Sequence, residues 1–331
     1  MSSTLFAAKN EPDAMSRAKP RPWRIDTHHH ILPPSYSAWL EALGVDDGGK
    51  PMPKWDVDNA LDQMDHNGIA VAILSVSTPG IFLASGADAR ARARDVNVFA
   101  ADTVARHPSR FGFLATLTLP DIDGAVAEAA YALDDLHADG VILLSSVAGT
   151  YLGDPAWEPL MAELNSRKAV VLVHPSNLPG PEAPGIPGYA ADFLLDTTRA
   201  AISLAKHGCL ERYPDLKIIL SHAGGFVPYA AERIAHICSP DGSTAGGIAR
   251  LRRFFFDTAL SSTPYALPSL LSFADPAHIT YGSDWPFASK ARSSEYRRQL
   301  DDFPLTDAQR LSIARSNAER LFPRFHGDGG E

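Results

Sequence analysis

The stretch Asp26-Thr27-His28-His29-His30-Ile31-Leu32-Pro33 carries the strongest signal for the fold and chemistry of this chain. If residues 24–30 form a strand, side chains alternate between faces, and Asp26, His28 and His30 share one of them. Two imidazoles on one face of a strand can bind one divalent metal ion, because neutral imidazole is a common metal ligand. An isolated pair is equally explained by a surface histidine cluster, so the metal hypothesis depends on the rest of the sequence.

The composition bounds the class of protein. The 331 residues, 45% of them hydrophobic and 21% charged, are typical of one globular α/β barrel domain. A formal net charge of −9 argues against a nucleic-acid partner, which usually requires a basic face. The cysteines Cys209 and Cys238 form no CxxC motif, which argues against a disulfide scaffold or a cysteine-based zinc site.

No apolar run approaches the length that spans a membrane, so no membrane association is expected. Residues 1–23 carry scattered charges and lack the uninterrupted apolar core of a signal peptide. We therefore expect a flexible N-terminal arm over residues 1–23 and a cytoplasmic location.

Eight strand-like runs alternate with helical patterns along the chain. After the first strand, such runs cover residues 69–76, 111–117, 141–144, 169–174, 216–222, 253–258 and 278–284. Several are rich in Val, Ile and Leu without polar alternation, as in parallel strands buried on both faces. The alternation predicts a parallel α/β fold.

We expect a (β/α)8, TIM-like barrel rather than a doubly wound sheet. A doubly wound sheet usually places a glycine-rich phosphate loop after its first strand, and none is present there. Barrel enzymes build their sites from the C-terminal ends of the strands, which is where the polar residues of interest fall. The expected organisation is a single barrel domain over residues 24–323 and a C-terminal tail over residues 324–331.

Four positions form a consistent set at strand ends. His28 and His30 lie on the first strand, His174 ends the fifth and Asp284 ends the eighth. Nitrogen and carboxylate ligands of this kind suit zinc, with manganese or iron as alternatives. His222 ends the sixth strand and is either a fifth ligand or a general base beside the metal. Each histidine alone could equally be a buried residue that bonds to the backbone, but the set is hard to attribute to chance.

The combined motifs resemble a known family. Asp-x-His-x-His-x-x-Pro, Val-His-Pro, Ser-His-Ala-Gly-Gly and Gly-Ser-Asp-Trp-Pro-Phe, in this order, are similar to the amidohydrolase superfamily. The similarity runs from about Arg24 to Phe322. Within the superfamily, the chain resembles the branch of aminocarboxymuconate semialdehyde decarboxylase and the aromatic-acid decarboxylases. Thr78-Pro79-Gly80 and Asp139-Gly140-Val141 look most like 6-methylsalicylate decarboxylases.

This resemblance implies His28, His30, His174 and Asp284 as metal ligands and His222 as the catalytic histidine. Binuclear amidohydrolases bridge two metals with a carboxylated lysine on strand four. Residues 140–146 contain no lysine. We therefore expect one divalent metal ion per chain, most simply zinc, with manganese possible.

Several residues are candidates for contacts with a substrate. Trp55, Phe82 and Phe287, like Tyr189 and Phe193, fall on expected loops above the barrel, where they could sandwich an aromatic ring or simply anchor the loops. Asn177 could bond a substrate hydroxyl or stabilise its own turn.

The resemblance also implies a shared site. An arginine at the position of Arg233 would reach into the neighbouring subunit to hold a carboxylate, in a homodimer or a dimer of dimers. The alternative is a solvated helix arginine paired with Glu232 or Asp241.

The leading hypothesis is a metal-dependent, non-oxidative decarboxylase that acts on a small hydroxylated aromatic, salicylate-like, or conjugated carboxylic acid. His222 or Asp284 would deliver the proton, directly or through metal-bound water. The alternative is a mononuclear metal-dependent hydrolase of a lactone, ester or amide, which would use the same ligands. A catalytically inactive binding scaffold ranks last, because all the ligands are present.

Overall fold

The computed structural model describes residues 23–45, 50–179 and 183–327. Its main sheet has eight parallel strands in the order β1-β2-β3-β4-β7-β8-β9-β10. These strands are β1 (Arg24–His30), β2 (Ile69–Ser75), β3 (Phe111–Thr116), β4 (Gly140–Leu144), β7 (Val170–His174), β8 (Lys217–Leu220), β9 (Phe255–Asp257) and β10 (Ile279–Thr280). A separate antiparallel pair, β5 (Ser146–Val147) and β6 (Thr150–Tyr151), lies in the loop after β4.

The last strand returns to the first and closes the sheet into a barrel. Thr27 N–H donates to Tyr281 O at 2.9 Å, and His30 N–H donates to Trp285 O at 2.7 Å. Parallel bridges at Asp26 and His29 accompany these bonds. The expected (β/α)8 barrel is therefore confirmed, and a doubly wound sheet, whose edges stay open, is not formed.

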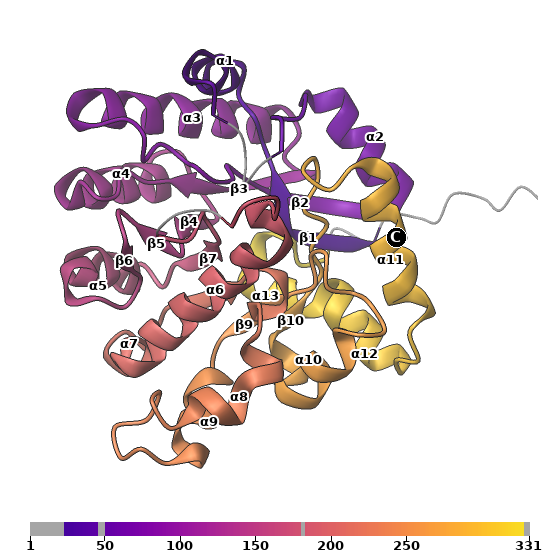
Figure 1. Ribbon diagram of the computed structural model, residues 1–331. Coiled ribbons are helices and arrows are strands. Elements are labelled where there is room, and N and C mark those ends of the chain that lie inside the picture. The colour runs from indigo at the N-terminus through magenta and orange to yellow at the C-terminus, as the bar shows by residue number, and fades with distance from the viewer. Residues whose placement is uncertain (1–22, 46–49, 180–182, 328–331) are drawn as a thin grey trace, which may run out of the picture.

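Helices surround the strands, as Figure 1 shows, with α3, α4 and α5 next to one another on the outside. The helices are α1 (Pro34–Leu43), α2 (Val57–Asn67), α3 (Gly86–Arg106), α4 (Ile122–Asp134), α5 (Glu158–Ser166), α6 (Gly188–Lys206), α7 (Cys209–Arg212), α8 (Val227–Ala235), α9 (Thr244–Leu251), α10 (Leu267–Phe273), α11 (Lys290–Asp302), α12 (Asp307–Leu311) and α13 (Asn317–Leu321). No helix in the described ranges is both long and apolar enough to cross a membrane.

The bottom of the barrel, meaning the interior on the side away from His174 and Asp284, is filled by an apolar cluster. Ile25, Val71, Leu172 and Ile219 meet there, and Phe325 from the end of the chain packs against them. Because these strands are covered on both faces, their side chains are apolar whether they point inward or outward. The continuous Val, Ile and Leu runs of the sequence have this physical cause.

Packing extends past the expected end of the domain at residue 323. Phe325 is fully buried, and Arg324 Nη2 donates to Asp139 Oδ2 at 2.8 Å. The expected N-terminal arm lies outside the described residues except for Trp23, whose N–H donates to Gly68 O at 3.0 Å. Residues 328–331 of the expected tail also lie outside the described residues.

Several strands are shorter than the sequence predicts; the run expected over 253–258 is extended only from Phe255 to Asp257. The expected strand over 216–222 is extended only from Lys217 to Leu220, and that over 278–284 only from Ile279 to Thr280. His222 and Asp284 have φ angles of 54° and 56°, in the left-handed region, which a strand cannot contain. The chain therefore leaves the sheet just before the residues that face the barrel mouth.

The strand alternation expected for β1 holds for His28 and His30 but is wrong for Asp26. The pairing of β1 with β2 is irregular between Asp26 and His29. Asp26 Oδ2 bonds His29 Nδ1 at 2.9 Å, and Asp26 Oδ1 accepts from Ser283 N–H at 3.0 Å. Asp26 thus ties the first strand to the segment before Asp284 instead of joining the metal-binding face.

Candidate metal centre and catalytic cavity

Four side chains from three parts of the barrel converge above its apolar interior. The ligand atoms of His28, His30, His174 and Asp284 all lie within 4.8 Å of one another, and all four residues are buried. His28 Nε2 and His30 Nε2 are 3.0 Å apart, and His30 Nε2 is 3.1 Å from Asp284 Oδ1. Such separations suit atoms that share one ion at bond lengths of about 2.0–2.2 Å.

The other ring nitrogen of each histidine ligand has its own partner. His30 Nδ1 lies 3.1 Å from Ser75 O, and His174 Nδ1 lies 2.8 Å from Pro175 O. Because a carbonyl oxygen only accepts, these contacts place the proton on Nδ1 and leave Nε2 free to bind a metal. Metal-binding histidines are usually oriented in this way. The residues therefore fit a divalent metal ion.

Asp257, at the end of β9, supports the centre and was missed by the sequence analysis. Its Oδ2 bonds His28 Nδ1 at 2.8 Å, and its Oδ1 accepts from the N–H groups of His222 and Ala259 at 2.9 and 3.0 Å. One fully buried carboxylate thus orients a metal ligand and the backbone of His222. A signal for it was present, because Asp257 follows the apolar run 254–256 as Asp284 follows its strand.

Burial and charge set the protonation of the ligands. Burial lowers the pKa of His30, and it lowers that of His174 well below the usual value, so both imidazoles are neutral. Burial would also lower the pKa of His28, but the Asp257 and Asp284 carboxylates together outweigh it and raise that pKa to about 10, so a metal ion would displace a proton from this imidazole on binding. Burial disfavours ionised Asp284, yet hydrogen bonds with His28 and His30 hold its pKa well below the usual range. Asp284 is therefore ionised and is available as an anionic ligand for a metal ion.

His222 lies beside the four ligands without joining them. Its ring is 5.0 Å from that of His28, and its Nε2 is 4.0 Å from Asp284 Oδ2. Neither of its ring nitrogens has a hydrogen-bond partner within the described residues, although both are buried. Burial lowers its pKa to about 4, so the imidazole is neutral near pH 7. A neutral imidazole with two unused nitrogens can both accept and donate a proton.

The centre opens into a cavity of about 940 Å³, which His174, His222 and Asp284 help to line. Phe287 lines this cavity with its ring 5.2 Å from that of His30, and Phe193 lines it 6.4 Å from His174. Cavities of this size are common for small-molecule sites. Among the aromatic residues expected around a substrate, Phe287, Tyr189 and Phe193 lie here.

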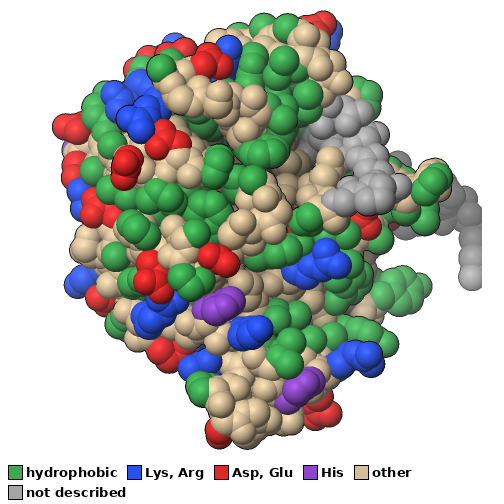
Figure 2. Space-filling model, turned by 60° about the vertical axis from the view of Figure 1, so that its left-hand side comes forward, with side chains coloured by type: hydrophobic (Ala, Val, Ile, Leu, Met, Phe, Trp, Pro, Cys, Tyr) green, Lys and Arg blue, Asp and Glu red, His purple; other side chains and the backbone are tan. Residues whose placement is uncertain are grey.

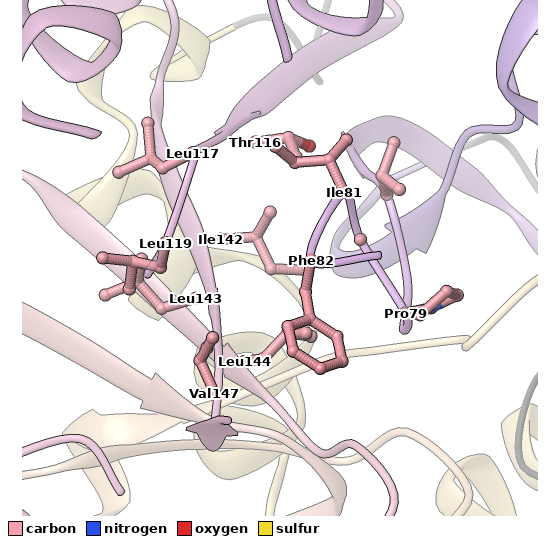
Figure 3. Close-up of a pocket in the computed structure, with 12 residues that line it drawn as sticks. Pro79, Ile81, Phe82, Thr116, Leu117, Leu119, Ile142, Leu143, Leu144 and Val147 are labelled. Atoms are coloured by element: carbon pink, nitrogen blue, oxygen red, sulfur yellow. The ribbon is translucent and has the colours of Figure 1, made fainter. Parts of the chain in front are cut away.

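Three other candidates lie away from this cavity. Phe82 lines a small apolar cavity of about 30 Å³, where it faces Leu144 and Val147 (Figure 3). Phe82 and Asn177 both line a neighbouring cavity of about 280 Å³. Trp55 packs against Phe99, with ring centroids 6.1 Å apart. Contacts of Trp55, Phe82 and Asn177 with a substrate stay predictions.

Arg233 is exposed on α8 and does not line the large cavity of its own chain. Tyr229, one helical turn earlier on α8, does line the cavity and is 86% exposed. Arg233 is thus a solvated helix arginine, as the alternative expects, but its expected ion pair with Glu232 or Asp241 does not occur among the described residues. The face drawn in Figure 2 carries acidic and basic side chains interspersed rather than one continuous basic area.

β4 contains no lysine at the barrel mouth. The strand ends at Leu144, which pairs in register with His174. The position next to this ligand is therefore occupied by an apolar side chain that cannot bridge two metal ions.

Comparison with known proteins places the chain in a family. A family model described as Amidohydrolase matches residues 25–324. The decarboxylase yanB of Aspergillus niger is 39% identical over 91% of this chain and 88% of its own length. The 6-methylsalicylic acid decarboxylase of Penicillium expansum is 35% identical over 92% and 97%. A crystal structure of an amidohydrolase II superimposes with a TM-score of 0.86 at 32% identity, over 91% of this chain and 99% of the other. The chain therefore belongs to the amidohydrolase family.

Proposed function

We propose that this protein is a metal-dependent, non-oxidative decarboxylase of a small hydroxylated aromatic carboxylic acid of the salicylate type. The observation that carries the proposal is the cluster of His28, His30, His174 and Asp284 beside His222, on the floor of a cavity with aromatic walls. The full-length similarity to decarboxylases, one of them named for 6-methylsalicylic acid, supports this reaction and substrate class.

One divalent metal ion per chain is proposed, held by the three histidines and Asp284. Zinc suits three nitrogen ligands and one carboxylate, and manganese is the alternative. When bound, the ion would orient the carboxylate and an ortho hydroxyl of the substrate and stabilise negative charge on them. The single-metal stoichiometry is supported by Leu144 at the end of β4, where a bridging lysine would be needed.

Side chains of the protein would transfer the proton that the reaction requires. Direct loss of carbon dioxide would leave a high-energy aryl carbanion, whereas a proton added first to the ring carbon that carries the carboxylate avoids it. The carbon–carbon bond then breaks, its electron pair restores the aromatic ring, and carbon dioxide leaves. His222 is proposed to carry this proton, because both its nitrogens are unpartnered and it faces the cavity. Asp284 is the alternative carrier.

Aromatic side chains are proposed to hold the ring. Phe287 lies next to His30 and Phe193 next to His174 within the cavity, and both would contact the faces or edges of the substrate ring. Trp55, Phe82 and Asn177 do not line the large cavity, and Phe82 and Asn177 would reach a substrate from the neighbouring cavity of about 280 Å³ that they line.

The proposed assembly is a homodimer or a dimer of dimers in which Arg233 enters the cavity of the partner chain. Two observations support this assembly. Tyr229 lines the cavity and lies one helical turn before Arg233 on α8. Arg233 is exposed and has no ion pair within the described residues. A two-fold axis near α8 would place each arginine over the other subunit's site. Mixing inactive Arg233→Ala and His222→Ala proteins should restore partial activity, because a hybrid dimer contains one complete site. No rescue despite demonstrated subunit exchange would rule out this shared-site assembly.

A cytoplasmic location also stays a prediction, which cell fractionation can test.

Metal analysis followed by a substrate panel tests the function. The purified protein would be incubated with salicylate, 6-methylsalicylate and other hydroxybenzoates while carbon dioxide release and ring absorbance are followed. A parallel panel of lactones, esters and amides tests the hydrolase alternative with the same metal centre. Hydrolysis without carbon dioxide release from any acid would overturn the decarboxylase proposal.

A further inference from the structure

Two of the three charged side chains that line the large cavity are basic, whereas the protein as a whole is acidic. Lys50, Asp284 and Arg292 are its charged lining residues, and Asp284 belongs to the metal centre. The chain has a formal net charge of −9. An aromatic carboxylate is repelled by such a net charge, so a cation at the cavity mouth matters for both encounter and binding.

One continuous segment forms the wall between the metal centre and Arg292. Phe287, Ala288 and Ser289 line the same cavity between Asp284 and Arg292. Ala288 N–H donates to Asp284 O at 2.7 Å and closes a turn. Ser289 caps α11, with its Oγ accepting from Arg292 N–H at 3.4 Å. The backbone of Arg292 is therefore fixed relative to the ligand Asp284.

The guanidinium of Arg292 is oriented by a tyrosine. Arg292 Nη2 donates to the Tyr296 hydroxyl at 3.2 Å, and the guanidinium lies 5.4 Å from the Tyr296 ring centroid. Tyr296 also lines the cavity. A guanidinium held against an aromatic ring keeps other N–H groups in its plane for a carboxylate.

Two other cations of α11 have acidic partners, whereas Arg292 has none among the described residues. Lys290 pairs with Asp62, and Arg297 pairs with Asp301. In the part of the chain that the structure describes, no carboxylate forms an ion pair with Arg292. Within the described residues Arg298 forms no ion pair either, but it does not line the cavity. Arg292 is therefore the cation of α11 that combines an unpaired guanidinium with a place on the cavity wall.

We propose that Arg292 binds the carboxylate of the incoming aromatic acid at the mouth of the cavity and thereby lowers KM. This role rests on the proposed substrate class, an aromatic carboxylate, and adds a binding residue supplied by the same chain as the metal ligands. It differs from the role proposed for Arg233, which would come from a partner subunit. Arg292 acts in capture of the acid, whereas the metal centre and His222 act in its conversion.

The test compares Arg292→Gln and Arg292→Lys with Arg298→Gln in the metal-loaded, full-length protein. Arg298 is a matched control, an exposed arginine on the same helix that does not line the cavity. Calorimetry measures Kd for benzoate, which carries the carboxylate but no hydroxyl, and carbon dioxide release gives kcat and KM for 6-methylsalicylate. Both would be measured at low and high ionic strength.

Arg292→Gln should raise Kd and KM about fivefold at low salt, with a smaller effect on kcat, and high salt should reduce the difference. Arg292→Lys should recover most of the loss because it keeps the charge. Equal Kd and KM in Arg292→Gln and Arg298→Gln would overturn the proposal. If the unsubstituted protein releases no carbon dioxide from any acid, the decarboxylase assignment fails, and the benzoate comparison still tests Arg292.

Discussion

The two ends of the barrel interior are built on the same strands and have opposite chemistry. Toward the bottom, Val71, Leu172 and Ile219 pack with Phe325 in an apolar cluster. Toward the mouth, His174 on the same strand as Leu172 joins a buried set of imidazoles and carboxylates. Apolar burial stabilises the fold, whereas buried polar groups cost stability unless each one is paired.

The difference separates the residues that mainly stabilise the fold from the residues that form the candidate site. At the bottom, each side chain can be replaced by another of similar volume at modest cost. At the mouth, the Nδ1 atom of each of His28, His30 and His174 has a hydrogen-bond partner, but both ring nitrogens of His222 lack one within the described residues. Substitutions at the two ends should therefore separate activity from stability.

The largest effect on activity should follow loss of a ligand. Asp284→Ala removes the anionic ligand, and we expect activity to fall below detection together with the metal content. His174→Ala should behave in the same way. Elemental analysis and carbon dioxide release measure the two quantities, and circular dichroism checks folding. Close to two ordered metal ions per unsubstituted chain would contradict the single-metal arrangement.

Loss of His222 should separate chemistry from metal binding. Because His222 lies beside the four ligands, His222→Ala should keep most of its metal while turnover falls by about 10²- to 10⁴-fold, the usual contribution of a general acid–base residue. Turnover in single-turnover assays and metal content by elemental analysis check this. A metal-free variant would make His222 a structural ligand and move the proton to Asp284.

Substitution of Asp257 should have an intermediate effect. Asp257→Asn keeps the side-chain shape but weakens the bond to His28 Nδ1, and we expect metal affinity to fall about 10- to 100-fold. Competition with a chelator measures this affinity. Asp275→Asn, at a helix cap away from the centre, is the matched control and should leave it unchanged. Equal affinities in the two variants would show that Asp257 does not orient the ligand.

The smallest effect on activity should come from the bottom of the barrel. Phe325 is fully buried there, and Phe325→Ala should lower the free energy of unfolding by about 3–5 kcal/mol through the cavity left behind. The folded fraction should keep its metal and its kcat. Leu311→Ala, at a side chain that is 50% exposed, should change stability by less than about 0.5 kcal/mol. Chemical denaturation measures both, and metal loss from folded Phe325→Ala protein would mean that the two ends are coupled.

Much of the barrel could be predicted from the sequence because its signals are local. Apolar runs flanked by turns identified the eight strands, and polar residues at or near their ends identified the four residues that the structure clusters as a candidate metal site. The exact ends of the strands could not be predicted from the sequence. His222 and Asp284 leave the sheet through left-handed backbone conformations that the residue types at these positions do not require. The alternation expected around His28 is confirmed for His28 and His30, which share one cluster, but is wrong for Asp26, since an irregular pairing with β2 redirects that carboxylate.

By itself, the sequence determined the barrel, the four candidate ligands and the family, because hydrophobic pattern and ligand type are properties of short segments. The tertiary structure decided which residues share a cavity. It brought Asp257 to His28 across 229 positions of sequence, placed Arg292 on the same wall as Asp284, and left Trp55 and Asn177 elsewhere. These relations arise from barrel closure and loop packing, in which each contact depends on many others far apart in the chain.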